Sequence, residues 1–313
     1  MREKTSSMMY YNGLQIDLEG RACATLRPTS DASTETERGG DCMKRALNHM
    51  TTPGLGLEAF LDLAAALDCV GVELRNDIDR PLFDGKAPGD ARGMIRDRGL
   101  RLVGLSQVYP FNDWSETRAA EVAALIDTAR AAGAETISLI PRNDGTGLGN
   151  GERHAKLRIA LKACKPMLED AGMVALVEPL GFTTSSLRAK ADLVETIEAL
   201  DATGTFRVVH DSFHHALAGG GPIFPAHTGI VHISAVADPA PSLEQMEDAH
   251  RGLVDEEDRL GTIDQLAALM QAGYDGPVSY ECFAPETHAL NDPERAIGRS
   301  FDFISARLAA KAA

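Results

Sequence analysis

Residues 173–211 read MVALVEPLGFTTSSLRAKADLVETIEALDATGTFRVVHD. Two apolar runs, 173–179 and 206–211, flank a segment over 186–200 whose apolar residues recur at helical spacing. An apolar run, an amphipathic helix and a second apolar run are typical of the βαβ unit of a parallel sheet. Because the runs are almost continuously apolar, they indicate strands that are covered on both faces.

The same alternation recurs along residues 43–313. Eight runs are predicted to be strands: 46–50, 69–75, 100–106, 135–140, 173–179, 206–211, 229–235 and 276–283. Helical segments between them end in glycine, as at Gly133 and Gly172, which favours a left-handed cap. Residues 43–313 therefore predict a single α/β domain, a (β/α)8 TIM barrel, which typically has about 250 residues. A doubly wound open sheet is the alternative, but no glycine-rich phosphate turn follows the first strand.

Residues 1–42 differ from the rest in composition. The stretch RPTSDASTETERGGDC (27–42) is polar and has neither a helical nor a strand period, so we expect a poorly ordered N-terminal arm. Two origins stay open. We favour an over-extended reading frame before a start at Met43, and the alternative is a genuine arm that packs on a partner subunit in a homo-oligomer.

Composition narrows the class of function. The 313 residues carry 31 Lys and Arg against 46 Asp and Glu, a formal charge of −15, which repels nucleic acid and anionic lipid. Five dispersed cysteines without CxxC spacing are typical of reduced thiols, so we expect a cytoplasmic protein. No apolar stretch approaches the ~20 residues of a membrane span, and no secretory signal opens the sequence. The expected partner is a small molecule, not nucleic acid or a membrane.

Side chains that can bind a metal follow four successive strands. Glu178, Asp211 and Glu281 end the fifth, sixth and eighth strands, and His232 lies near the end of the seventh. In a barrel these ends meet at one mouth. Singly, each has an ordinary explanation, since a carboxylate can pair with an arginine, an aspartate can cap a turn and a buried histidine is usually structural. Together, three carboxylates in a mouth of low dielectric constant need a compensating cation.

We therefore predict one divalent metal ion bound by these four side chains. Three carboxylates and one imidazole suit Mn²⁺, Mg²⁺, Co²⁺ or Zn²⁺, and the sequence does not choose among them.

These motifs resemble the xylose-isomerase-like TIM-barrel superfamily over most of residues 43–313. The likeness is carried by VEPLGF (177–182), VVHDSFHHA (208–216), IVHIS (230–234) and SYECF (279–283). Within the superfamily the chain is most similar to bacterial 2-keto-myo-inositol isomerases (inosose isomerases), through GVELRND, LIPRNDG, EPLGFTTSSLR and HISAVADP.

The resemblance implies a role for each matching residue. Glu178 and Glu281 would transfer protons through an enediolate, besides binding the metal, and interconvert 2-keto-myo-inositol and 1-keto-D-chiro-inositol. The implied or candidate substrate contacts are His214, Arg251, His250, Arg75, Asn76, Asn143 and Asp144. A pair of solvated loop residues explains His250 and Arg251 equally well. Loop capping explains Asn143 and Asp144 equally well. His215 is expected only to begin a helix.

Two departures from the family pattern bear on the reaction. Ala235 stands where many relatives have an aspartate, which argues against a second metal. The endonuclease branch has histidines after the second and third strands, where this chain has ELRND and LSQVY. With the formal charge of −15, this argues against DNA as the substrate. The resemblance implies a cyclic polyol or keto-sugar instead. A ketose 3-epimerase, an inosose dehydratase and a non-catalytic polyol-binding barrel stay open, although a purely structural metal site would need no pair of basic glutamates.

Overall fold

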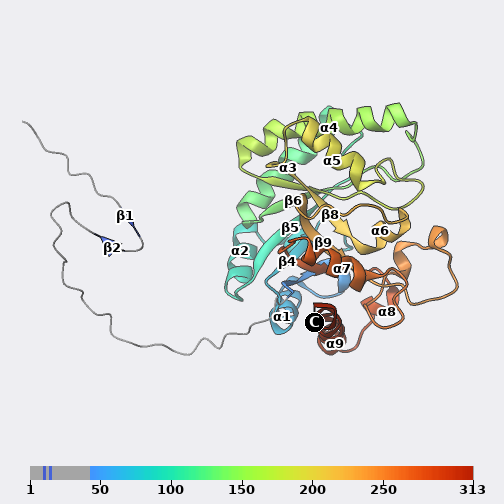
Figure 1. The fold of residues 1–313 in the computed structure, drawn as a ribbon. Helices are drawn as coiled ribbons and strands as arrows, with labels where there is room; N and C mark the ends of the chain where they lie inside the picture. The colour runs from blue at the N-terminus through green and yellow to red at the C-terminus, as the bar shows by residue number, and fades with distance from the viewer. Residues whose placement is uncertain (1–9, 12–13, 16–42, 313) are drawn as a thin grey trace, which may run out of the picture. The chain divides into compact units, whose positions relative to one another are not determined.

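The computed structural model describes residues 10–11, 14–15 and 43–312, which Figure 1 draws in colour. Tyr10–Tyr11 (β1) and Leu14–Gln15 (β2) pair as a short antiparallel ladder. The rest of the predicted arm, 1–42, lies outside the described residues, so its expected lack of order stays a prediction.

Residues 43–312 contain a closed barrel of eight parallel strands, as the sequence predicts. In barrel order the strands are β3 (Arg45–Asn48), β4 (Gly71–Arg75), β5 (Arg101–Val108), β6 (Thr136–Leu139), β7 (Val174–Val177), β8 (Phe206–Asp211), β9 (Thr228–Ile233) and β10 (Val278–Tyr280). Because β10 pairs with both β9 and β3, the sheet has no edge. The alternative of an open doubly wound sheet is therefore wrong.

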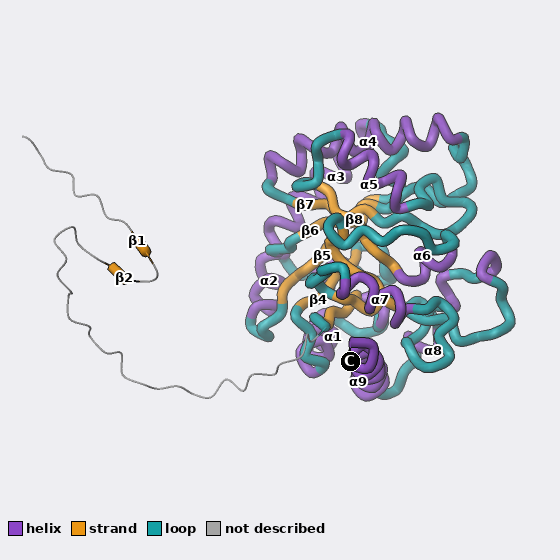
Figure 2. Tube along the Cα trace, viewed as in Figure 1, coloured by secondary structure: helices purple, strands orange, loops and turns teal. Residues whose placement is uncertain are grey.

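Helices follow the strands and surround the barrel (Figure 2). They are α1 (Leu57–Ala66), α2 (Pro88–Arg96), α3 (Glu116–Ala132), α4 (Asn150–Ala171), α5 (Lys190–Ala199), α6 (Ser212–Leu217), α7 (Thr262–Gln271), α8 (Pro285–His288) and α9 (Pro293–Ala312). Short 3-10 turns lie at His49–Thr51, Leu82–Gly85, Leu243–Gln245 and Asp248–His250. No helix among the described residues is both long and apolar enough to cross a membrane.

The helix ends can be compared with the predicted glycine caps and with the predicted helix over 186–200. The helices α3 and α4 end at Gly133 and Gly172, whose φ angles of 72° and 61° confirm the left-handed caps. The helix predicted over 186–200 begins only at Lys190. Its first predicted turn is instead a hydrogen-bonded loop, in which the backbone N–H of Leu180 donates to the carbonyl of Leu187 over 3.0 Å. Apolar spacing does not reveal such a loop.

Two apolar layers support the mouth of the barrel. A large cluster packs between the strands and the surrounding helices. A smaller cluster consists of Val103, Leu176, Val209 and Ile230. The last three lie two residues before Glu178, Asp211 and His232, respectively. Since side chains alternate along a strand, they share the inner face with these polar residues and form an apolar floor beneath them.

Candidate metal centre

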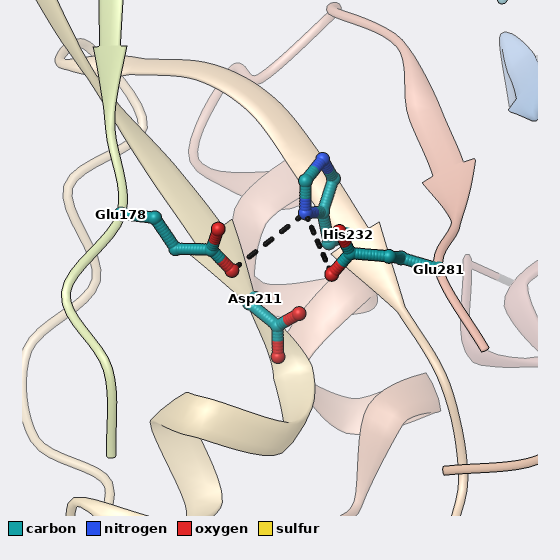
Figure 3. Close-up of side chains that lie close together, drawn as sticks. All are labelled: Glu178, Asp211, His232 and Glu281. Atoms are coloured by element: carbon teal, nitrogen blue, oxygen red, sulfur yellow. Dashed lines mark ion pairs between the residues drawn. The ribbon is translucent and has the colours of Figure 1, made fainter. Parts of the chain in front are cut away.

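Glu178, Asp211, His232 and Glu281 converge at one point (Figure 3). One ligand atom from each lies within 4.8 Å of the others, and all four side chains are buried. Nδ1 of His232 is 3.7 Å from Oε1 of Glu178 and 3.3 Å from Oε2 of Glu281. Opposite ligands bound at about 2.1 Å from one ion lie about 4.2 Å apart. The cluster therefore has the size of a site for a single metal.

The ends of neighbouring strands place these four groups. Asp211 is the last residue of β8 and lies opposite His232 of β9 in the ladder. Glu178 and Glu281 follow directly after β7 and β10. The order β7-β8-β9-β10 around the barrel thus delivers the four side chains side by side.

Glu73 on β4 fixes the orientation of His232. Oε2 of this fully buried carboxylate lies 3.0 Å from Nε2 of His232. The contact at Nε2 leaves Nδ1 as the nitrogen that faces the cluster, where it can bind a metal ion once the ring has lost its Nδ1 proton. Among the described buried atoms without a hydrogen-bond partner are Nδ1 of His232 and Oε1 of Glu178, which lie 3.7 Å apart. A metal ion would give both atoms a partner. Glu73 is not among the predicted site residues, because its only signal in the sequence is a charge inside the apolar run GVELR.

Two buried arginines contact the carboxylates. Arg251 Nη2 donates to Oε2 of Glu281 over 2.9 Å and also to Oδ2 of Asp211. Arg75 Nη1 donates to Oε1 of Glu281. The loop that carries Arg251 is held by two backbone hydrogen bonds between Ala235 and Gly252. The ordinary explanation of Glu281, pairing with an arginine, therefore holds alongside the metal interpretation.

The environment separates the proton affinities of the two glutamates. Burial raises the pKa of Glu178, and the nearby charge of Glu281 raises it further. Burial also acts to raise the pKa of Glu281, but His232 and Arg251 outweigh it and hold this pKa well below its usual range. Two carboxyls whose proton affinities are separated in this way suit an acid role and a base role.

A cavity of about 260 Å³ opens at the cluster, and we call it the mouth cavity. Among the predicted substrate contacts, Arg75, Asn143, His214 and Arg251 line it. Nε2 of His214 lies 3.9 Å from Oε1 of Glu178, while its backbone N–H donates to Oδ1 of Asp211. Asp211 therefore caps α6, as its ordinary explanation predicts, and also directs an oxygen toward the cluster.

Three predicted contacts lie elsewhere. His250 lines a separate cavity, because the short 3-10 turn at 248–250 folds its ring back to accept from the backbone N–H of Glu247 over 2.9 Å. Asn76 is used in hydrogen bonds to the backbone of Gln107. Asp144 caps its own loop at Thr146. The mouth cavity is lined instead by Asp77, Gln107, Tyr109 and Phe283, among others. The sequence gives no local signal for these residues.

Comparison with known proteins assigns the family. Residues 61–307 match the family described as Xylose isomerase-like TIM barrel. The chain belongs to this family. A solved xylose isomerase domain containing protein from Salmonella typhimurium LT2 is 30% identical, with a TM-score of 0.78, over 85% of this chain and 97% of that chain. No curated protein sequence matches the chain.

More distant structures share the fold. A structure of the IolI protein with a zinc atom is 19% identical, with a TM-score of 0.74, over 86% of this chain and 99% of that chain. A D-allulose 3-epimerase from Methylomonas sp., in complex with D-allulose, is 15% identical, with a TM-score of 0.61, over 87% and 96% of the two chains. Because both structures are less than 25% identical to this chain, they show a shared fold and not a shared reaction.

Proposed function

We propose that the protein is a divalent-metal-dependent isomerase of cyclic keto-polyols that interconverts 2-keto-myo-inositol and 1-keto-D-chiro-inositol. The observation that supports this most is the pair Glu178 and Glu281. The two glutamates lie on either side of His232 (Figure 3) and differ in proton affinity. Such a pair suits the movement of a ketone by one carbon, because one carbon loses a proton and its neighbour gains one.

The residues fit one metal ion, held by Glu178, Asp211, His232 and Glu281. When bound, a divalent ion supplies a Lewis acid that stabilises negative charge developing on the substrate oxygens. The zinc atom in the IolI structure supports a metal in this fold and does not identify the ion that this chain binds.

Proton transfer is assigned to the two glutamates. Glu281, whose pKa is lowered, takes the proton from the hydroxyl-bearing carbon and leaves an enediolate, and the hydroxyl proton passes to the former carbonyl oxygen. Glu178, whose pKa is raised, returns a proton to the former carbonyl carbon, and proton exchange with solvent restores both glutamates. Arg75 and Arg251 hold the carboxylate of Glu281 through its two oxygens. His214, in the wall of the mouth cavity beside Glu178, is placed to bind a substrate hydroxyl and set the register of the ring.

The test is a substrate panel followed by proton NMR in D₂O. It compares 2-keto-myo-inositol with the open-chain ketose D-allulose, after chelation and after addition of Mn²⁺, Mg²⁺, Co²⁺ or Zn²⁺. We expect the highest kcat/KM for the keto-inositol, loss of turnover after chelation and recovery with metal.

Other products would move the assignment. Faster epimerisation of D-allulose would indicate a ketose 3-epimerase, and a product that has lost water would indicate an inosose dehydratase. Binding of the polyol without turnover, with every metal tried, would indicate a non-catalytic barrel.

A further inference from the structure

A second cavity, of about 240 Å³, lies between the N-terminus of α5 and α6, and we call it the α5 cavity. His214 lines both this cavity and the mouth cavity. Neither the predicted metal ligands nor the proposed proton transfer explains the cationic side chains that gather here.

The α5 cavity collects positive charge. Three cationic side chains line it: Arg153, Arg188 and Lys190. Among the described residues of its lining, the only carboxylate is Asp211. Both oxygens of Asp211 are already engaged, one by the backbone N–H of His214 and the other by Arg251. The lining of the α5 cavity is therefore positively charged, although the whole chain carries a formal charge of −15.

Lys190 contacts bases rather than an acid. Its Nζ lies 3.1 Å from Nδ1 of His210 and 2.6 Å from Nδ1 of His215. Two neutral imidazoles accept hydrogen bonds but do not neutralise an ammonium group. Burial lowers the pKa of Lys190 to about 7. A pKa this low indicates that the site provides little negative charge to stabilise the ammonium group. The expectation that His215 only begins a helix is wrong, because α6 begins at Ser212 and His215 contacts Lys190 from within it.

The two arginines are also poorly compensated. Arg188 donates to the backbone carbonyls of Gly181 and Leu217 over 2.6 and 2.5 Å, which positions its guanidinium without cancelling the charge. Nη2 of Arg153 is 3.6 Å from Oδ2 of Asp192, and Nε of Arg153 is buried without a hydrogen-bond partner among the described residues.

Backbone donors face the same space. The first turn of the ten-residue helix α5 lines the cavity, and its N-cap residue Ala189 provides no side-chain cap. The backbone N–H groups of such a turn, with the positive end of the helix dipole, favour an anion. Gly220, from the loop Gly219–Gly221, also lines the cavity, and all three glycines have positive φ, at 87°, 76° and 106°. A glycine-rich loop allows a ligand to approach the backbone closely.

We infer that the α5 cavity is a binding site for a phosphate group. Tetrahedral oxyanions are bound by this combination of arginines, a lysine, an uncapped helix N-terminus and a glycine-rich loop. The phosphate has two sources with the same chemistry, inorganic phosphate and a phosphate monoester. This inference does not depend on the proposed isomerase activity, because its test measures binding alone.

The experiment titrates the purified full-length protein with inorganic phosphate and with glycerol 1-phosphate by isothermal calorimetry. The variants are Lys190→Gln and Arg153→Gln, and the matched controls are Lys162→Gln and Arg158→Gln, on the exposed face of α4. Each test variant should weaken binding on the order of tenfold, since each removes a charge-assisted contact. The controls should stay within about twofold of wild type, as surface charges outside the contact do.

The comparison of ligands identifies the source. Equal affinity for both ligands points to free phosphate, and tighter binding of glycerol 1-phosphate points to a monoester. If Lys190→Gln fails to fold, the result for Arg153→Gln alone tests the inference. Arg153 is only partly buried on the surface of α4, so its substitution should not prevent folding. Absence of binding by the wild type, or equal affinities in the foldable test variants and the controls, would overturn the inference.

Discussion

Glu73 decides which nitrogen of His232 faces the three carboxylates. Its contact to Nε2 leaves Nδ1 facing the cluster without a hydrogen-bond partner among the described residues. Glu73→Gln keeps the shape of the side chain but removes its charge, so the imidazole becomes a weaker and less well oriented ligand. We expect metal affinity to fall about 10–100-fold, the usual effect of losing such a partner. A competition titration with a chromogenic chelator measures this, with the exposed Glu257→Gln as control. Equal affinities in both variants would show that Glu73 does not support a metal ligand.

The two glutamates of the cluster carry the proposed chemistry. Glu178→Gln and Glu281→Gln each remove a proton carrier while leaving an oxygen that can contact a metal. We expect kcat to fall by about 10²–10⁴, the usual contribution of a general acid or base. The readout is turnover of the keto-inositol together with deuterium in the product formed in D₂O. Near-normal kcat in both variants, with product free of deuterium, would favour a hydride shift over proton transfer.

The sequence predicts residues at strand ends far better than residues within strands. Glu178, Asp211, His232 and Glu281 were found because strand ends converge at the mouth of a barrel. Glu73 was missed because its partner, His232, is distant in sequence, and only the closed barrel brings them together. His250 and Arg251 are adjacent, yet only Arg251 enters the mouth, because the turn at 248–250 directs the two side chains apart.

At the scale of secondary-structure elements, Lys190 joins α5 to β8 and α6 through His210 and His215. Its folded pKa of about 7 lies below the ordinary value of 10.5. Between these values the unfolded chain binds more protons than the folded chain. The contribution of Lys190 to the free energy of unfolding therefore rises with pH in this window, by at most about 1.4 kcal/mol per pH unit.

Lys190→Met removes this dependence while keeping a side chain of similar length. We expect the variant to exceed wild type in stability near pH 7.5 and to lose that advantage by pH 9.5. Urea unfolding at both values measures the difference, and taking wild type minus variant cancels the titration of other groups. A difference that is constant with pH would mean that Lys190 titrates normally.

Element boundaries were less predictable than element types. All eight barrel strands agree with the apolar runs, because burial on both faces leaves a strong pattern. The start of α5 was placed four residues early, at Ser186 instead of Lys190, because the loop before it is held by long-range contacts. Ser186, for example, donates from Oγ to the carbonyl of Arg142. The error also placed Lys190 inside the predicted helix. In the structure Lys190 is the first residue of α5 and lines the α5 cavity.

At the scale of the whole molecule, the barrel core begins at Met43, which is buried, and closes through β3 and β10. We expect a protein that begins at Met43 to keep the melting temperature, activity and oligomeric state of the full chain. Thermal unfolding, turnover and size-exclusion chromatography of the two proteins test this. A large loss of stability or activity would mean that residues 1–42 pack on the barrel or on a partner subunit.

Glu178, Asp211, His232 and Glu281, at four strand ends, are expected to bind one divalent metal ion. The direct test is the number of metal ions bound per chain in His232→Ala, compared with wild type and with His250→Ala. The second variant makes the same chemical change in a loop outside the mouth cavity. We predict about one ion per chain in wild type and His250→Ala, and close to none in a folded His232→Ala protein. Unchanged metal content in His232→Ala, or no tightly bound divalent ion in the wild type, would contradict the claim.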